Sequence, residues 1–184
     1  DFIVDTTGDI FFNGQIGTSH ALNSLTVSNA SQITLNGNVS TVGNQSYGGP
    51  VVLSGDVTSH AANGSVAFTS TVDGAFLLDV EANGTTTFDQ AAGGQTRLSG
   101  IITGSNGNTI LAADIATRGA GQSFGNAVSI TNDVTLSDNQ LGNISFDSTI
   151  DGAYNLTIAT DGMTTFQGAV GATQALNNIT VTSA

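Results

Sequence analysis

The sequence predicts an all-β fold, a right-handed parallel β-solenoid (β-helix) built of stacked coils of about 20 residues. Three observations favour this fold. The composition is that of strands and turns, one long block of sequence recurs three times, and apolar residues alternate with polar ones inside short segments. An antiparallel β-sandwich is the alternative, because the many Asn-Gly and Asp-Gly pairs also form hairpin turns.

The composition favours strands over helices and a packed core over disorder. The chain has 24 glycines, one proline and no cysteine or tryptophan. Thr, Val, Ile, Ser and Asn fill segment after segment, and these are residues of strands and turns. Hydrophobic residues make up 39% of the chain and are regularly placed, which is not a pattern of disorder. The absence of cysteine excludes a disulfide framework.

The charge of the chain is strongly acidic. Arg97 and Arg118 are the only Lys or Arg residues against 14 Asp and Glu, so the formal net charge is -12. Nucleic acid and anionic membrane surfaces are therefore poor partners, because binding them needs clustered Lys and Arg. The sequence also lacks an apolar run of the about 18 residues that span a bilayer, so we expect no membrane insertion.

One block of sequence occurs three times, and each copy has a phenylalanine at the same position. Phe12 and Phe88 are 76 residues apart, and Phe88 and Phe166 are 78 apart. Extra residues enter near Gly119-Ala120-Gly121 and again before Phe146, and both places are expected to be turns. The predicted repeat anchors are Phe12, Phe88, Phe166, Leu35, Leu111, Tyr47, Phe124, Phe68 and Phe146.

The repeat predicts one solenoid segment over residues 1–184. Residues 1–7 form the tail of a preceding repeat, 8–83 the first repeat, 84–161 the second and 162–184 part of a third. Four intervals between anchors fill one repeat, which predicts four coils of about 20 residues, and three larger coils are the alternative. We expect no polar capping coil at either end, so the chain is either part of something longer or built to join end to end.

Alternation within the anchor segments predicts strands with one buried face. Ile33-Thr34-Leu35, Val66-Ala67-Phe68 and Leu156-Thr157-Ile158 each place apolar side chains on one side and a small or polar one on the other. A short coil cannot bury that face alone, but stacking at about 4.8 Å on the next coil makes a continuous core.

The third copy carries a resemblance to a known family. The run from Gly162 to Gly171 (GMTTFQGAVG), followed by Ala175 to Val181 (ALNNITV), resembles the repeats of giant filamentous-haemagglutinin-like bacterial surface proteins. The resemblance covers essentially the whole chain. It implies a right-handed parallel β-helix that is secreted to the outer surface of Gram-negative bacteria and serves adhesion, biofilm or filament formation. It carries over no receptor-binding motif.

Nothing in the sequence predicts catalysis, and we expect neither an enzyme nor a cofactor. His20 and His60 are isolated and lie at variable positions that we interpret as turns. Asp73 and Asp151 recur at matching places and are a conceivable carboxylate pair for a polysaccharide-active enzyme. Both precede Gly, however, which is what a turn requires.

Calcium is the metal that the oxygen-rich turns would suit best. The run from Asp147 to Gly152 loosely resembles a calcium loop, so Asp147 and Asp151 are the candidate ligands. The hydroxyl-rich run Thr85-Thr86-Thr87 leaves an ice-binding surface as a further alternative, although exposed threonine suits any strand.

The function that the sequence favours is mechanical. We expect a structural repeat segment of a secreted surface adhesin or extracellular filament, acting as a stiff rod. Its partners would be further copies of itself, the neighbouring repeats of a longer chain, or host and matrix glycans. A carbohydrate- or ice-binding solenoid module is the second hypothesis and a polysaccharide-active enzyme the third.

Overall fold

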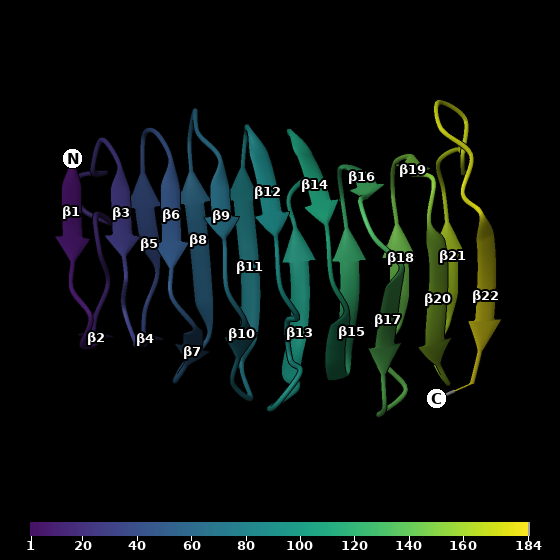
Figure 1. Ribbon diagram of the computed structural model, residues 1–184, viewed down its shortest axis with the longest axis horizontal. Helices are drawn as coiled ribbons and strands as arrows, with labels where there is room; N and C mark the ends of the chain where they lie inside the picture. The colour runs from purple at the N-terminus through teal and green to yellow at the C-terminus, as the bar shows by residue number, and fades with distance from the viewer. Residues whose placement is uncertain (184) are drawn as a thin grey trace.

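The computed structural model describes residues 1–183 and forms one β-solenoid of about nine turns, with about 21 residues per coil (Figure 1). Every strand pair is parallel. The predicted parallel solenoid is therefore confirmed, and the antiparallel sandwich is wrong. Over the same residues there is no helix that could cross a membrane.

The chain crosses three faces in each coil, and we name them faces A, B and C in the order of crossing. Face A consists of β1 (Phe2–Asp5), β3 (Leu25–Ser28), β6 (Gln45–Gly48), β9 (Val66–Phe68), β12 (Thr85–Phe88), β14 (Asn108–Leu111), β16 (Ala127–Ile130) and β19 (Ile150–Asp151). Face B consists of β2 (Asp9–Phe12), β4 (Gln32–Leu35), β7 (Val51–Leu53), β10 (Val72–Asp73), the first part of β15 (Ile115–Phe124), β17 (Val134–Asp138), β20 (Asn155–Thr160) and β22 (Asn178–Thr182). Face C consists of β5 (Val39–Thr41), β8 (Val57–Ala61), β11 (Leu77–Ala82), β13 (Leu98–Thr103), the last part of β15, β18 (Ile144–Phe146) and β21 (Thr164–Phe166).

Strand β15 is the longest because it rounds the corner between faces B and C. Its start pairs with β17 on face B, and its end pairs with β18 on face C. Gly119 and Gly121 have positive φ angles of 89° and 78° at the bend, a conformation that glycine adopts without strain. The first predicted insertion therefore lies at a corner, but inside strand β15 rather than in a separate turn.

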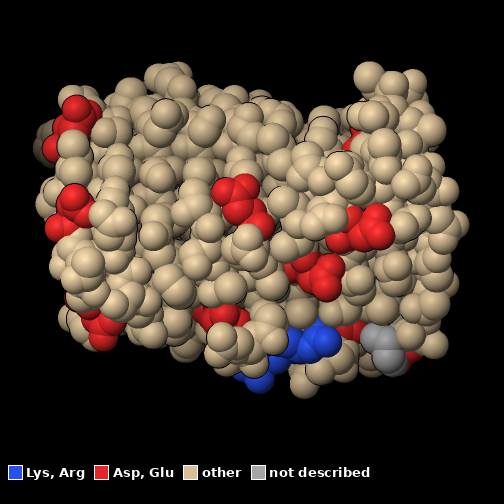
Figure 2. All heavy atoms as spheres, in the orientation of Figure 1, with Lys and Arg blue, Asp and Glu red and all other residues tan. Residues whose placement is uncertain are grey.

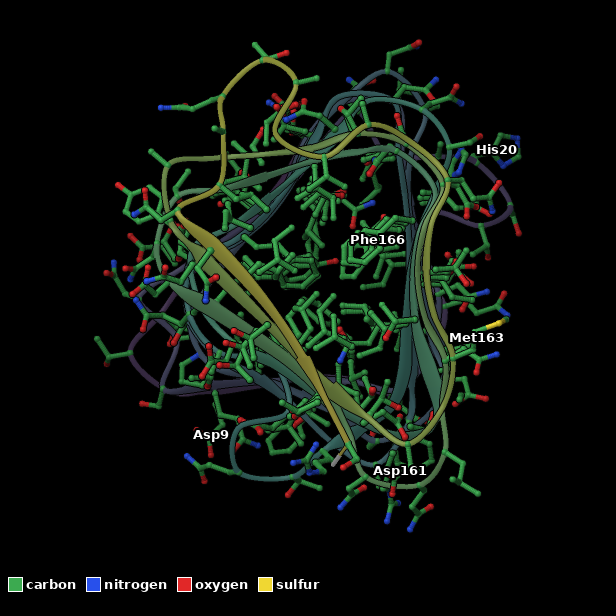
Figure 3. The ribbon with its side chains drawn as sticks, turned by 90° about the vertical axis from the view of Figure 1, so that its right-hand side faces the viewer. Asp9, His20, Asp161, Met163 and Phe166 are labelled. Atoms are coloured by element: carbon green, nitrogen blue, oxygen red, sulfur yellow. The ribbon has the colours of Figure 1, made fainter. Side chains whose placement is uncertain are left out.

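The interior is filled by the alternating apolar side chains. Burial along β8 and β17 alternates between buried and partly exposed residues, as a strand with one inward face requires. Figure 3 looks along the rod from its C-terminal end and shows the ribbon closing around side chains, with Phe166 inside and Met163 outside.

Two stacks of aromatic rings run along the rod inside this core. Neighbouring rings are nearly parallel, and their centroids are 5.0 to 5.3 Å apart, one ring per coil. Such offset contacts add to the hydrophobic stabilisation of the core. The rings are Tyr47, Phe68 and Phe88 on face A and Phe124, Phe146 and Phe166 on face C.

The two stacks show how the long repeat relates to the coils. Equivalent strands of the three copies are β2, β12 and β21, and these lie on faces B, A and C. One copy thus spans three coils and two further faces, eleven faces in all. The expected whole number of coils per repeat is wrong. Each copy is instead rotated by one face relative to the copy before it.

Candidate functional site

Acidic and amide side chains at the corners connect one coil to the next. Each accepts a hydrogen bond from a backbone N–H that follows 20 to 22 residues later, which is one coil along the rod. These bonds satisfy donors at or next to the first residue of a strand. The acceptor and donor pairs are Asn38 and Thr58, Asn44 and Ser65, Asp56 and Leu77, Asp114 and Thr135, Asp133 and Asn155, and Asn143 and Met163.

Asp73 and Asp151 perform the same role and do not form a catalytic pair. Asp73 Oδ1 accepts the backbone N–H groups of Gln95 and Thr96 at 2.8 and 3.0 Å. Asp151 makes the equivalent two bonds in the next copy at 2.8 and 3.0 Å, and these bonds lower the pKa of its carboxyl. The two residues lie on faces B and A, in different coils. They cannot flank one glycosidic bond.

The calcium hypothesis receives no geometric support from the two candidate ligands. Asp147 Oδ1 accepts the side-chain amide of Gln167 at 2.8 Å, and Asp151 Oδ1 accepts backbone N–H groups. Within residues 1–183, no group of three His, Cys, Asp or Glu side chains could hold a metal ion. Calcium binding stays a prediction.

The interpretation of His60 as a turn residue is wrong, whereas His20 does lie in a bend. His60 lies in β8 on face C, between Ser40 and Glu81 of the neighbouring coils. Its Nδ1 is 3.0 Å from Glu81 Oε2, and both side chains are about half exposed. A carboxylate in this position fixes the orientation of the imidazole. Ser40 makes no side-chain hydrogen bond to His60 in the described residues. Ser40, His60 and Glu81 therefore do not form a hydrogen-bonded series of nucleophile, base and carboxylate.

Asp138 is a buried carboxylate that no pattern in the sequence marks. Its oxygens accept the Thr117 hydroxyl at 2.9 Å and the backbone N–H groups of Gly119, Gln140 and Gly142 at 2.9, 2.9 and 2.8 Å. Burial raises the pKa of this carboxyl, but the hydrogen bonds outweigh burial and lower it overall. The two inserted segments of the second repeat therefore meet at one side chain.

The terminal coils expose side chains that are buried in every inner coil. At the first coil, Phe2 is 41% exposed, whereas its register partner Leu25 is fully buried. At the last coil, Ile179 and Val181 are 39% and 53% exposed, although their register partners on β20 are buried. The backbone edges of β1 and β22 that face away from the rod pair with no strand of the described chain. Both ends are thus apolar sheet edges of the kind to which further strands add.

Comparison with known protein families, with curated proteins and with solved structures finds no match to this chain.

Proposed function

We propose that this chain is a stiff segment of an extracellular stalk or filament, of the kind found in bacterial surface adhesins, and that its role is mechanical rather than catalytic. The observation that supports this most directly is the ladder of face A, which runs from β1 to β19 with one strand per coil and no gap. The resemblance of the repeats to filamentous-haemagglutinin-like proteins supports the extracellular setting and the adhesive context.

The three faces explain why such a segment resists bending. Backbone hydrogen bonds between coils run along the rod, and the faces surround the core on all sides (Figure 3). Bending in any direction therefore stretches the hydrogen bonds of at least one face. The eight steps between nine coils, at about 4.8 Å each, give a rod about 38 Å long.

The open ends supply the means of extension. The inward-facing Phe2 at one end and Ile179 and Val181 at the other would be buried by a further coil, as their partners are inside the rod. Further coils of a longer chain and the end of a second copy both present parallel strands and an apolar interior. Either would extend the sheets without changing the cross-section.

Electron microscopy of the purified chain over a range of concentrations tests the proposal. We expect rods of constant width whose length grows with concentration. A Val181→Lys variant, which places a charge in the last coil, should give only short rods. Particles of the size of one chain from both proteins at every concentration would contradict self-assembly but leave the stalk segment.

A further inference from the structure

A groove of about 510 Å³ opens on the outer side of face A, near the C-terminal end of the rod. Its floor is β16, and its sides come from Thr149, from residues 151–154 and from Thr173 and Gln174. The last two belong to the loop between β21 and β22, which projects beyond the outline of the coils at the top of Figure 1. The groove is therefore bounded by a loop that projects from the regular stack.

Four of the polar side chains that line this groove are available to a ligand. Ser129, Tyr154, Thr173 and Gln174 make no side-chain hydrogen bond within residues 1–183. Asp151 also lines the groove, but its Oδ1 already accepts two backbone N–H groups. What remains is a set of hydroxyls and one amide, which both donate and accept.

Tyr154 adds an aromatic surface to these hydrogen-bonding groups. Its side chain is 39% exposed, whereas the other tyrosine of the chain, Tyr47, is fully buried. An aromatic face is electron-rich and attracts the C–H groups on the flat side of a sugar ring, while hydroxyls and amides bind the sugar's own hydroxyls.

We propose that this groove binds a neutral polysaccharide, with Tyr154 stacking on a sugar ring and Ser129, Thr173 and Gln174 binding its hydroxyls. The absence of charge in the ligand follows from the lining. No Lys or Arg side chain lines the groove, and the chain as a whole carries a formal charge of -12, which disfavours acidic glycans. The side chains that end-to-end joining would bury, Phe2, Ile179 and Val181, do not line the groove, so the two proposals rest on different residues.

The first repeat offers a matched control for this site. Phe76 is the equivalent of Tyr154 and is similarly exposed, at 37%, but it has no hydroxyl. Val52 takes the place of Ser129 on the equivalent strand β7. The first copy thus keeps the exposed ring and lacks two of the hydroxyls, and it lies on face B instead of face A.

Electrophoresis of the folded protein through native gels that contain laminarin, hydroxyethyl cellulose or dextran tests this site. We expect at least one of these neutral polysaccharides to slow the wild-type protein. Tyr154→Ala should weaken that retardation by at least about tenfold, as the loss of a central aromatic contact does in other interfaces. Phe76→Ala should leave it unchanged. Circular dichroism of both variants checks that they are folded.

Three results would overturn the proposal. The first is a wild-type protein that none of the three polysaccharides retards. The second is a Tyr154→Ala variant that keeps its retardation, and the third is a Phe76→Ala variant that loses as much. These results leave the rod proposal intact, because the shape and assembly of the chain are measured separately by microscopy.

Discussion

The side-chain amide of Gln45 lies inside the core with all of its hydrogen-bonding groups occupied. Its Oε1 accepts the Tyr47 hydroxyl at 2.8 Å and the Ser59 hydroxyl at 2.5 Å. Its Nε2 donates to the Thr41 hydroxyl at 3.2 Å and to the His60 carbonyl at 2.8 Å. Burial raises the pKa of the Tyr47 phenol, which stays protonated and keeps donating. A polar group buried at this depth is tolerated because it is fully bonded.

The second repeat contains the same amide with half of its partners missing. The Nε2 atom of Gln122 donates hydrogen bonds to a threonine hydroxyl and to backbone carbonyls, as Nε2 of Gln45 does. The Oε1 atom of Gln122, however, is buried without a partner in the described chain. The reason is visible in the sequence, since Phe124 and Leu136 stand where the first repeat has a tyrosine and a serine. Neither phenylalanine nor leucine can donate a hydrogen bond to the amide oxygen.

We expect Tyr47→Phe to lower the free energy of unfolding by about 1 kcal/mol, because the buried Gln45 oxygen loses one of its two donors. Urea denaturation measures the change. Tyr154→Phe is the matched control, since it removes an exposed hydroxyl and should leave the stability within about 0.5 kcal/mol of the wild type. Equal effects of the two substitutions would contradict the role of Tyr47.

A double-mutant cycle tests the exchange in the second repeat. Phe124→Tyr alone crowds Leu136, and Leu136→Ser alone leaves a cavity, so each should destabilise the protein. Together they rebuild the arrangement around Gln45, so we expect the double variant to be more stable than the sum of the single changes predicts, by about 1 kcal/mol or more. Strict additivity in urea denaturation would show that the two sites are independent.

Asp138 should make the free energy of unfolding depend on pH. Because its folded-state pKa is lowered, its contribution is fully present above the unfolded pKa of about 3.9 and is lost as the pH falls through the folded-state pKa. Asp79 acts in the opposite direction, since burial and the charge of Glu81 raise the pKa of its carboxyl. The effect of Asp138 is therefore best measured as a difference between variants.

We expect Asp138→Asn to destabilise the protein by about 2 kcal/mol at neutral pH, because one acceptor oxygen of the buried group becomes a donor. The difference from the wild type should shrink as the pH falls through the lowered folded-state pKa of Asp138, because the wild-type carboxyl is then itself protonated. Asp147→Asn, at an exposed position, is the control. A difference that stays constant with pH would show that the charge of Asp138 does not contribute.

At the scale of the elements, close contact between coils restricts the corners. Gly107 precedes β14 with a φ of 68°, and a Cβ atom there would overlap the carbonyl oxygen of Gly84 in the coil before. We expect Gly107→Ala to lower the free energy of unfolding by about 2 kcal/mol or more. Gly14 has no atom within 4 Å of the same position, so Gly14→Ala should have little effect in thermal or urea denaturation.

The strands themselves could be predicted from the sequence, because alternation over short segments is a local signal. The aromatic stacks were missed, although Tyr47, Phe68 and Phe88 are spaced by 21 and 20 residues, which is the coil length. The similarity within the sequence recurs at spacings of 76 to 78 residues, which are not multiples of the coil length. Those spacings join equivalent residues on different faces and cross the rod rather than follow it.

The polar interior could not be predicted from the sequence. The partners of Asp138 include Thr117 and Gly119, which come from the coil before it, and no local pattern marks such a contact. The Glu81 partner of His60 was missed for the same reason, since the two residues are 21 positions apart. Once the coil length is known, both contacts follow from adding one coil to the residue number.

At the scale of the whole molecule, the rotation of the repeat by one face determines which face of the rod carries each recurring surface feature. Surface features that recur in each copy, such as the corners that begin at Asp73 and Asp151, appear on faces B and A in turn. A longer array of the same repeats would place them on all three faces. A rod built in this way presents its surface features in every direction.

Charge at the ends should make assembly depend on salt. Asp1, Asp5 and Asp9 lie on the first coil and Asp161 near the last, and Figure 2 shows basic atoms only at the lower edge of the visible surface, away from both ends. Joining two copies therefore brings like charges together. We expect analytical ultracentrifugation to show more association as salt rises from about 0.01 M to about 0.5 M, because the charges are screened. Association that weakens with salt would contradict apolar joining of the ends.

Cysteine cross-linking tests the stacking of the coils most directly, because the natural chain has no cysteine. Ser123 and Ser145 are neighbours on face C with their Oγ atoms 3.4 Å apart, and Ser46 and Ala67 are the equivalent register pair on face A. After replacement by cysteine and mild oxidation, both pairs should form intramolecular disulfides, whereas the mixed pair of Ser46 and Ser145 should not. Failure of both register pairs, or cross-linking of the mixed pair, would contradict the three-faced solenoid.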